Sequence, residues 1–225
     1  MPVVLHFDSN FTEIKPSGRT AHHWDYLELT RGFNSSRYDV GDLCDQYGLK
    51  AGIRGRWQDR VVLPYVQDGE LVTWSARAIS QATIRYRDLE IEDSNGNAVS
   101  LVPPKETLFN HDAMLKGGKA LVLVEGPFDA LKIDFYGQTF DVRAVALSTN
   151  SISEEQSYLL QAASGLFERV VIMLDNATSL GIIDSMRMRQ ALHFLSNISI
   201  TKVPYGAKDG GDLSPSKVRQ WARTF

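Results

Sequence analysis

The sequence predicts an α/β protein of two subdomains, and three observations support this fold class. In the C-terminal half, short uninterrupted apolar segments alternate with helical segments, as expected for a parallel sheet covered by helices on both faces. The N-terminal half instead has helical segments followed by an antiparallel hairpin, which is typical of an α+β subdomain. An extended, proline-containing segment at 102–105 separates the two patterns, and we place the domain boundary between residues 115 and 116.

The N-terminal subdomain is expected to begin with two helices. Residues 1–20 carry few periodic signals, and we assign them no element. Apolar and aromatic residues at helical spacing predict a helix over 21–33, which Gly32 ends, and a second over about 35–47, which ends at Gly48. Two strands are predicted at 60–66 and 71–78, because the Asp-Gly pair between them favours a tight hairpin turn.

Residues 50–88 form a basic and aromatic region, with seven Lys and Arg against four Asp and Glu in a protein of net charge -3. Trp57, Tyr65, Trp74 and Tyr86 are interleaved with these charges. One interpretation is an antiparallel sheet whose aromatic side chains face the core. The other is a groove that follows a phosphate backbone and stacks one or two bases on its rings. Charge and aromatic content alone favour the first interpretation.

The C-terminal subdomain is predicted to be organised around a central strand at 120–124, an apolar run with no polar alternation. Gly126 then allows the backbone to turn, and Pro127 suits the first position of a helix. Three further strands are predicted at 142–147, 170–174 and 198–203. Helices are predicted at 154–163, 181–195 and 215–221. The expected architecture is an open parallel sheet of about four strands.

Carboxylates follow the predicted strands. Glu125 comes directly after the central strand, Asp129 lies in the next helix's first turn, Asp175 follows the third strand, and Asp209 and Asp212 lie in a glycine-rich loop. The carboxyl ends of parallel strands share one edge, so we expect these side chains to meet there. Two carboxylates about 4 Å apart repel by roughly 4 kcal/mol at an effective dielectric of about 20, which favours a bound cation such as Mg²⁺ or a shared proton.

Each acid also has a structural explanation, as a helix cap or a turn residue, so only their convergence would indicate a site. Phospho-acceptor domains of the receiver type gather acids at a similar edge, and the cluster alone therefore leaves the reaction open.

Composition excludes several classes of protein. The single Cys44 excludes a disulfide framework, and with five histidines beside it no zinc-ribbon spacing can be assembled. No apolar run reaches the roughly 20 residues that span a bilayer, and the first residues lack a signal-peptide pattern. No G-x-x-x-x-G-K-[ST] motif for phosphate binding occurs. We therefore expect a cytoplasmic protein with no membrane partner.

Three acidic segments, in this order, resemble the motifs of the Toprim domain: VEGPFDAL at 124–131, LDN at 174–176 and KDGGD at 208–212. Four upstream segments are similar to the catalytic core of bacterial and phage DNA primases: 26–33, 60–65, 74–78 and 103–109. The resemblance covers about residues 22–215. It implies a C-terminal Toprim domain preceded by an N-terminal subdomain that carries a basic hairpin.

The resemblance implies a DNA primase catalytic core, a nucleotidyltransferase that makes short RNA primers on a single-stranded DNA template. Its substrates would be ribonucleoside triphosphates, and its cofactor Mg²⁺ or Mn²⁺. Glu125, Asp129 and Asp175 would be the catalytic acids. The expected metal ligands are these three residues together with Asp209 and Asp212. The candidate nucleotide- or DNA-binding residues are Arg56, Arg60, Arg77, Arg85, Arg87, Lys105 and Lys208.

The sequence departs from the family pattern in two ways. The middle motif reads Asp175-Asn176-Ala177, where the family has two aspartates one residue apart, so one carboxylate is missing. Asn176, Asp212 or Asp184 are the available substitutes, and Asp184 is a poor one because it lies well inside a predicted helix. The sequence also lacks a zinc-binding template-recognition module and a helicase. A replicative helicase or a separate zinc-binding subunit is therefore an expected partner.

Two alternatives stay open. The same acids would serve a Toprim nuclease. The altered middle motif is also compatible with a catalytically degenerate module that binds nucleic acid or acts as a replication accessory protein.

Overall fold

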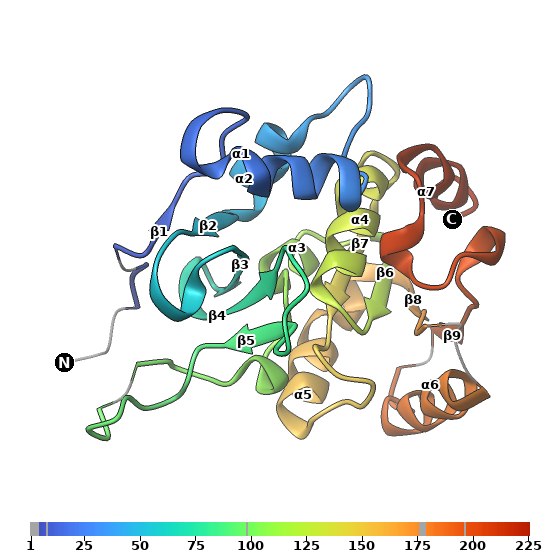
Figure 1. Cartoon of the computed structure of the whole chain (residues 1–225). Helices are drawn as coiled ribbons and strands as arrows, with labels where there is room; N and C mark the ends of the chain where they lie inside the picture. The colour runs from blue at the N-terminus through green and yellow to red at the C-terminus, as the bar shows by residue number, and fades with distance from the viewer. Residues whose placement is uncertain (1–4, 8, 98, 176–178, 196) are drawn as a thin grey trace. The chain divides into compact units, whose positions relative to one another are not determined.

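The computed structural model describes residues 5–7, 9–97, 99–175, 179–195 and 197–225. The chain forms two compact units, Met1–Pro104 and Lys105–Phe225, drawn from blue to green and from green to red in Figure 1. The first unit contains a five-stranded antiparallel sheet and the second a four-stranded parallel sheet. The predicted α/β fold class, with an antiparallel hairpin ahead of the parallel sheet, is confirmed.

The sheet of the first unit has the strand order β1-β2-β3-β4-β5. Its strands are β1 (Phe11–Thr12), β2 (Lys50–Gly52), β3 (Arg60–Gln67), β4 (Glu70–Ala78) and β5 (Tyr86–Asp88). The predicted hairpin is β3 and β4, and its turn residues Asp68 and Gly69 both have positive φ, 54° and 81°. The strands β2 and β5 were not predicted, because strands of three residues are too short to show an alternating pattern.

The helical elements of the first unit are η1 (Gly18–Thr20), α1 (Ala21–Asp25), the π-helical η2 (Tyr26–Thr30), α2 (Val40–Tyr47) and η3 (Gly55–Trp57). The helix expected at 35–47 begins later, so its predicted start was wrong. Asp39 accepts a hydrogen bond from the Asp42 amide (3.0 Å), and the Asp42 carboxylate accepts one from the Asp39 amide (3.0 Å). This reciprocal cap sets the start of α2, and Gly48, with φ 64°, ends it as predicted.

Aromatic side chains form the core of the first unit. The Trp57 and Trp74 ring centroids are 6.1 Å apart, and Phe11 lies 5.4 Å from Trp74. Tyr65 is fully buried. The interpretation that the interleaved aromatics face the core is therefore confirmed for Trp57, Tyr65 and Trp74, while Tyr86 is only half-buried.

The sheet of the second unit has the order β7-β6-β8-β9, with every pair parallel. Its strands are β6 (Gly118–Val124), β7 (Val142–Ala146), β8 (Phe167–Ile172) and β9 (Ile198–Ile200). Its α-helices are α3 (His111–Met114), α4 (Pro127–Gly137), α5 (Glu154–Ala163), α6 (Ser179–Ala191) and α7 (Pro215–Ala222). Shorter helical turns are η4 (Pro104–Glu106, spanning the junction of the two units), η5 (Gln138–Phe140), η6 (Ser164–Leu166), η7 (Pro204–Gly206) and η8 (Gly210–Asp212). The four predicted strands are all present, although β8 and β9 end earlier than expected.

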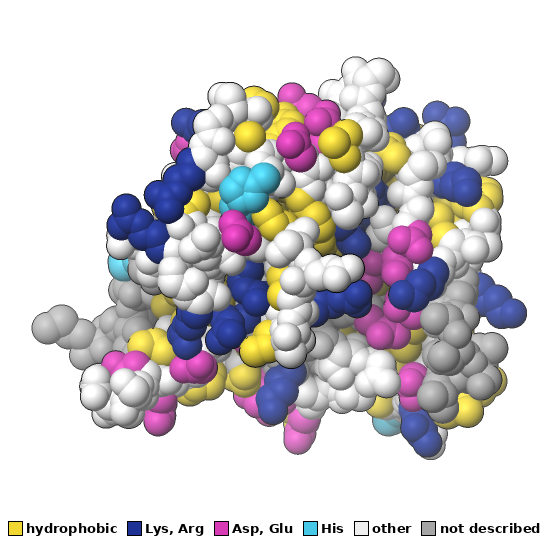
Figure 2. All heavy atoms as spheres, viewed as in Figure 1, with side chains coloured by type: hydrophobic (Ala, Val, Ile, Leu, Met, Phe, Trp, Pro, Cys, Tyr) yellow, Lys and Arg dark blue, Asp and Glu magenta, His cyan; other side chains and the backbone are white. Residues whose placement is uncertain are grey.

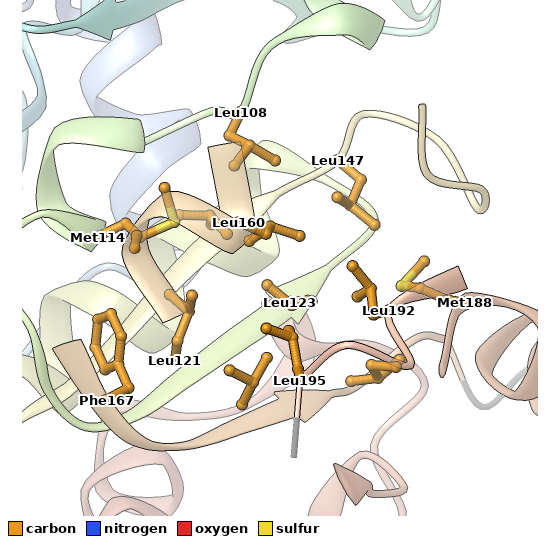
Figure 3. Close-up of a cluster of buried hydrophobic side chains, with 14 of the residues drawn as sticks. Leu108, Met114, Leu121, Leu123, Leu147, Leu160, Phe167, Met188, Leu192 and Leu195 are labelled. Carbon is orange, nitrogen blue, oxygen red and sulfur yellow. The ribbon is translucent and has the colours of Figure 1, made fainter. Parts of the chain in front are cut away.

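Helices cover both faces of the parallel sheet. On one face Leu121 and Leu123 of β6 pack in a buried cluster with Leu160 of α5 and Leu192, the residue directly after α6, as Figure 3 shows. On the other face α4 packs on β6 and β7, and α7 packs on α4. Among the described residues, no helix combines the length and the apolarity needed to cross a membrane.

The segment 105–115 packs within the second unit. Phe109 forms a bridge with Ala146, with N–O distances of 3.0 and 3.2 Å in the two directions. The buried side chain of Gln156 donates from Nε2 to the carbonyls of Thr107 (2.7 Å) and Leu147 (2.8 Å). The division between the compact units, after Pro104, lies eleven residues before the domain boundary expected between residues 115 and 116. That expected boundary stays a prediction.

We expect Gln156→Leu to lower the free energy of unfolding by about 2 kcal/mol, because it removes two hydrogen bonds to backbone carbonyls from a buried position. Urea denaturation would measure this change. Gln161→Leu, at an exposed position of the same helix, is the control and should change stability by less than about 0.5 kcal/mol. Equal stabilities of the two variants would contradict the role assigned to Gln156.

Candidate active site

Glu125 lies where β6 ends, held between the segments that follow two neighbouring strands. Its carbonyl accepts a hydrogen bond from the Ser148 amide beyond β7 (2.8 Å). Its half-buried side chain accepts at Oε1 from the Asp175 amide beyond β8 (3.3 Å). The acidic residues after β6 and β8 are therefore next to each other, as the shared edge of a parallel sheet predicts.

Asp129 joins the start of α4 to the glycine-rich loop. It is 9% exposed and lies in the helix's first turn. Its Oδ2 accepts from the Gly126 amide (3.2 Å), and its Oδ1 accepts from the Gly211 amide (2.8 Å). A Cβ at Gly210 would approach Ile133 Cδ1 to 2.9 Å, so this close packing of loop on helix favours glycine.

Asp175 is partly buried and lies among other negative charges, and both conditions affect its pKa. Burial, and next the charges of Glu125 and Asp209, raise the pKa of Asp175 to about 6. Asp212 raises this pKa further, whereas Lys208 opposes the shift. The Asp209 carboxylate also accepts from the Asp212 amide (3.0 Å), which caps η8. We call these five acids the acidic rim: Glu125, Asp129, Asp175, Asp209 and Asp212.

The space-filling view agrees with this arrangement. Figure 2 shows acidic side chains gathered over the region of α4 and the loop before α7.

The acidic rim carries the donors that a hard divalent cation prefers, but among the described residues no three of its carboxylates have oxygens within 4.8 Å of one another. Its donors are carboxylate oxygens from three separate segments, which Mg²⁺ and Mn²⁺ prefer. Burial is the largest cause of the raised pKa of Asp175, and the repulsion from Glu125 and Asp209 adds more to it than the charge of Lys208 removes. A divalent cation would relieve this repulsion, and its binding would displace the proton that Asp175 holds below about pH 6.

The residues named as substitutes for the missing middle carboxylate have different outcomes. Asn176 and Ala177 lie outside the described residues. Asp212 is part of the acidic rim and exposed. The Asp184 carboxylate accepts from Asn150 Nδ2 (3.0 Å) and lies 3.6 Å from the Arg187 guanidinium. These contacts agree with the expectation that Asp184 is a poor substitute.

A basic pocket of about 710 Å³ lies within the first unit. Arg31, Arg77 and Arg85 line it together with η2 and the loop after β4. Arg77 and Tyr86 are paired across β4 and β5, and the guanidinium lies 4.7 Å from the centre of the ring. Arg77 Nε is buried and has no hydrogen-bond partner in the described part of the chain. Sequence reasoning missed Arg31 as a pocket residue, although it belongs to the segment 26–33 that carried the resemblance.

Arg60 contacts the loop that lines this pocket. Its side chain is buried, and its guanidinium donates to the carbonyls of Ala76 (3.2 Å), Ile84 (2.8 Å) and Arg85 (3.4 Å). Burial, and next the charge of Arg87, lower the pKa of Arg60. These contacts hold the loop after β4 in place, so the geometry gives Arg60 a structural task. Its predicted contact with a nucleotide stays a prediction.

The remaining basic candidates are spread over both units. Arg56 is exposed, pairs with Glu90 (2.7 Å) and lies over the Trp57 ring. Arg87 is half-buried on β5, Lys105 is exposed in η4, and Lys208 is exposed beside the acidic rim. Their roles in binding stay predictions.

We expect Asp175→Asn to stabilise the metal-free protein at pH 8. The folded-state pKa of about 6 lies above the ordinary value of 3.8, so the stabilising contribution of Asp175 is complete below about pH 4 and is lost as the pH rises through 6. The neutral amide avoids this loss, and the gain at pH 8 should be about 1 kcal/mol after solvent screening.

Urea denaturation in the presence of a chelator, at pH 8 and near pH 4, would measure the difference in free energy of unfolding between Asp175→Asn and the wild type. This difference should vanish at the lower pH. Glu168→Gln, at an exposed acid of β8, is the control and should be neutral at both. A variant less stable than the wild type at pH 8 would show that Asp175 carries no electrostatic penalty.

No protein-family model matches the sequence, and no curated protein sequence matches it. Solved structures do match. The Escherichia coli primase catalytic core is 15% identical, with 87% of this chain and 69% of that chain covered and a TM-score of 0.62. The RNA polymerase domain of Mycobacterium tuberculosis primase DnaG is 18% identical, with coverages of 92% and 74% and a TM-score of 0.65. The bacteriophage T7 primase fragment is 16% identical, with coverages of 81% and 66% and a TM-score of 0.52. The chain therefore has the fold of a primase catalytic core.

Proposed function

We propose that this chain is the catalytic core of a DNA primase, which makes short RNA primers on single-stranded DNA from ribonucleoside triphosphates. One observation carries the proposal: Glu125, Asp175 and Asp209 meet at one edge of the sheet in a chain that has the primase-core fold. The fold alone does not select a reaction, whereas carboxylates crowded at one edge are what metal-assisted phosphoryl transfer requires.

Comparison structures support nucleic acid as the partner. A DnaG primase catalytic domain bound to single-stranded DNA has a TM-score of 0.59, with 17% identity. Primase domains of T7 gp4, bound to an RNA/DNA hybrid and dTTP, have a TM-score of 0.57. We infer the same class of ligand for this chain.

In the proposed mechanism Asp129, Asp175 and Asp209 hold Mg²⁺ or Mn²⁺, with Glu125 and Asp212 as further oxygen donors. When bound, the ions neutralise the charge that develops on the phosphates and align the attacking 3′-hydroxyl with the leaving group. Asp129 keeps its bonds to the amides of Gly126 and Gly211 and so fixes the width of the rim. Glu125, held by the Asp175 amide, is the acid that we place nearest the reacting groups.

The basic pocket is the proposed phosphate-binding surface of the first unit. Arg77 and Arg85 would bind the template backbone or the incoming triphosphate, and we add Arg31 to this set. The remaining candidates, Arg56, Arg87, Lys105 and Lys208, would contribute weaker contacts because they are more dispersed.

We also propose that start-site choice depends on a partner, either a replicative helicase or a separate zinc-binding subunit. The Aquifex aeolicus structure with zinc-binding and RNA polymerase domains matches 76% of this chain but only 41% of its own length. The T7 fragment comes from a primase-helicase protein. We place the protein in the cytoplasm of a bacterial or phage-infected cell.

Glu125→Gln and Asp175→Asn should each reduce template-dependent ribonucleotide incorporation by at least about a hundredfold, because each removes a ligand for the catalytic cation. Incorporation of labelled ribonucleotides on single-stranded DNA with Mn²⁺ would measure this loss. Glu168→Gln is the control, because Glu168 is an exposed acid near the start of β8, and this variant should keep wild-type activity. Incorporation that survives both changes would rule out the assigned site.

The same assay separates the alternatives. A wild-type protein that binds Mn²⁺ and DNA but incorporates nothing would support a degenerate module, which the Ala177 departure motivates. Cleavage of labelled DNA without added nucleotides would instead support a nuclease.

Arg77→Ala should raise the dissociation constant for single-stranded DNA about fivefold and reduce the salt-dependence slope by about 0.7, the loss of one phosphate contact. Filter binding across a salt series would measure both quantities. Arg37→Ala is the matched control, because Arg37 also lies over a ring, 5.3 Å from the centre of Tyr38, but outside the pocket. An unchanged slope in Arg77→Ala would remove Arg77 from the binding surface.

A further inference from the structure

A strained turn precedes the acidic rim. Tyr205 has φ 58° and ψ 22°, and Gly206 has φ 69°. The amide of Ala207 donates to the carbonyl of Pro204 (3.3 Å), which closes a four-residue turn with two left-handed central residues. Asparagine, aspartate and glycine favour the first central position of such a turn, whereas a side chain as large as tyrosine is strained there.

Burial offsets this strain only in part. Tyr205 is 45% exposed, so nearly half of the hydrophobic stabilisation that a tyrosine can supply is absent. Its ring lies 5.8 Å from the Nζ of Lys217 in α7, an exposed cation. A bulky, partly exposed residue in a left-handed conformation is more often explained by a task outside the fold than by packing.

The position of the turn indicates what that task is. Tyr205 lies three residues before Lys208 and four before Asp209, and both of these influence the pKa of Asp175. The next helix, α7, carries Lys217 and Arg219 and no acidic residue, and Arg223 follows it directly. Arg219 and Arg223 lie over the rings of Tyr136 and Phe140, so Lys217 is the cation of this group that faces Tyr205. The partly exposed ring and its cation therefore directly precede the loop that supplies Asp209 to the acidic rim.

We propose that Tyr205 stacks on a nucleobase of the single-stranded nucleic acid held at the acidic rim, while Lys217 pairs with an adjacent phosphate. This inference rests on the proposed function and adds a positioning residue to it. Aromatic rings interleaved with cations bind single strands without sequence preference, because every base presents a π-face. The strained turn holds the ring in a defined orientation before the strand arrives, which reduces the ordering that binding requires.

Two ligands and four proteins test this inference. The ligands are a single-stranded oligo(dA) about 12 nucleotides long and an abasic strand of the same length, which keeps the phosphates but has no bases to stack. The proteins are the wild type, Tyr205→Asn, Tyr205→Phe and the control Tyr158→Asn, whose tyrosine is 62% exposed on α5. Fluorescence anisotropy with Mn²⁺ gives the dissociation constants, and thermal unfolding gives the stability of each variant.

We expect Tyr205→Asn to weaken oligo(dA) binding about tenfold and to leave abasic binding unchanged, because only the stacking contact is lost. Tyr205→Phe should bind both strands as the wild type does, since it keeps a ring. The melting temperature of Tyr205→Asn should equal or exceed that of the wild type, because asparagine suits the left-handed position. Tyr158→Asn should leave both affinities unchanged.

Three outcomes would overturn the inference. Equal oligo(dA) affinities for the wild type and Tyr205→Asn, in a wild type that binds and makes primers, would overturn this inference alone. Equal losses on oligo(dA) and on the abasic strand would show a backbone contact rather than stacking. A wild type that binds neither strand would overturn the proposed function as well.

Discussion

The repulsion among carboxylates at the carboxyl edge of the parallel sheet is the constraint on which the candidate site depends. Parallel pairing of β6 with β8 places Glu125 and Asp175 together, and the Gly211 amide bonded to Asp129 adds the glycine-rich loop. These backbone amides hold the acids in position, while burial and next the charges of Glu125 and Asp209 keep the pKa of Asp175 well above its ordinary value. A site of this kind lowers the stability of the metal-free protein and gains it back when a divalent cation binds.

Two features of the second unit lower its stability, and the turn at Tyr205 directly precedes the loop that supplies part of the acidic rim. The acidic rim concentrates negative charge, and the turn at Tyr205, just before the loop that supplies Asp209, holds a bulky residue in a left-handed conformation. Functional sites commonly retain such local costs, which the surrounding packing must balance. Here that packing is the fully buried cluster around β6 and the burial of α4 against the sheet.

The features that could be predicted from the sequence depend on local chemistry. The hairpin follows from Asp68-Gly69, the start of α4 from Pro127, and the convergence of the acids from the rule that parallel strands share an edge. The features that could not be predicted depend on tertiary partners. Arg60 reads as a surface cation until the carbonyls of three distant residues surround it, and Arg31 joins the basic pocket only through the fold of η2.

The most direct test is a calorimetric titration of the wild-type protein with Mn²⁺ at pH 6 and pH 8, in buffers of different ionisation enthalpy. We expect saturable binding at both values. We also expect release of a fraction of a proton at pH 6 that is much smaller at pH 8, since Asp175 is largely ionised by then. No saturable binding, or binding without this pH-dependent proton release, would contradict the claim that the converging carboxylates form a cation site.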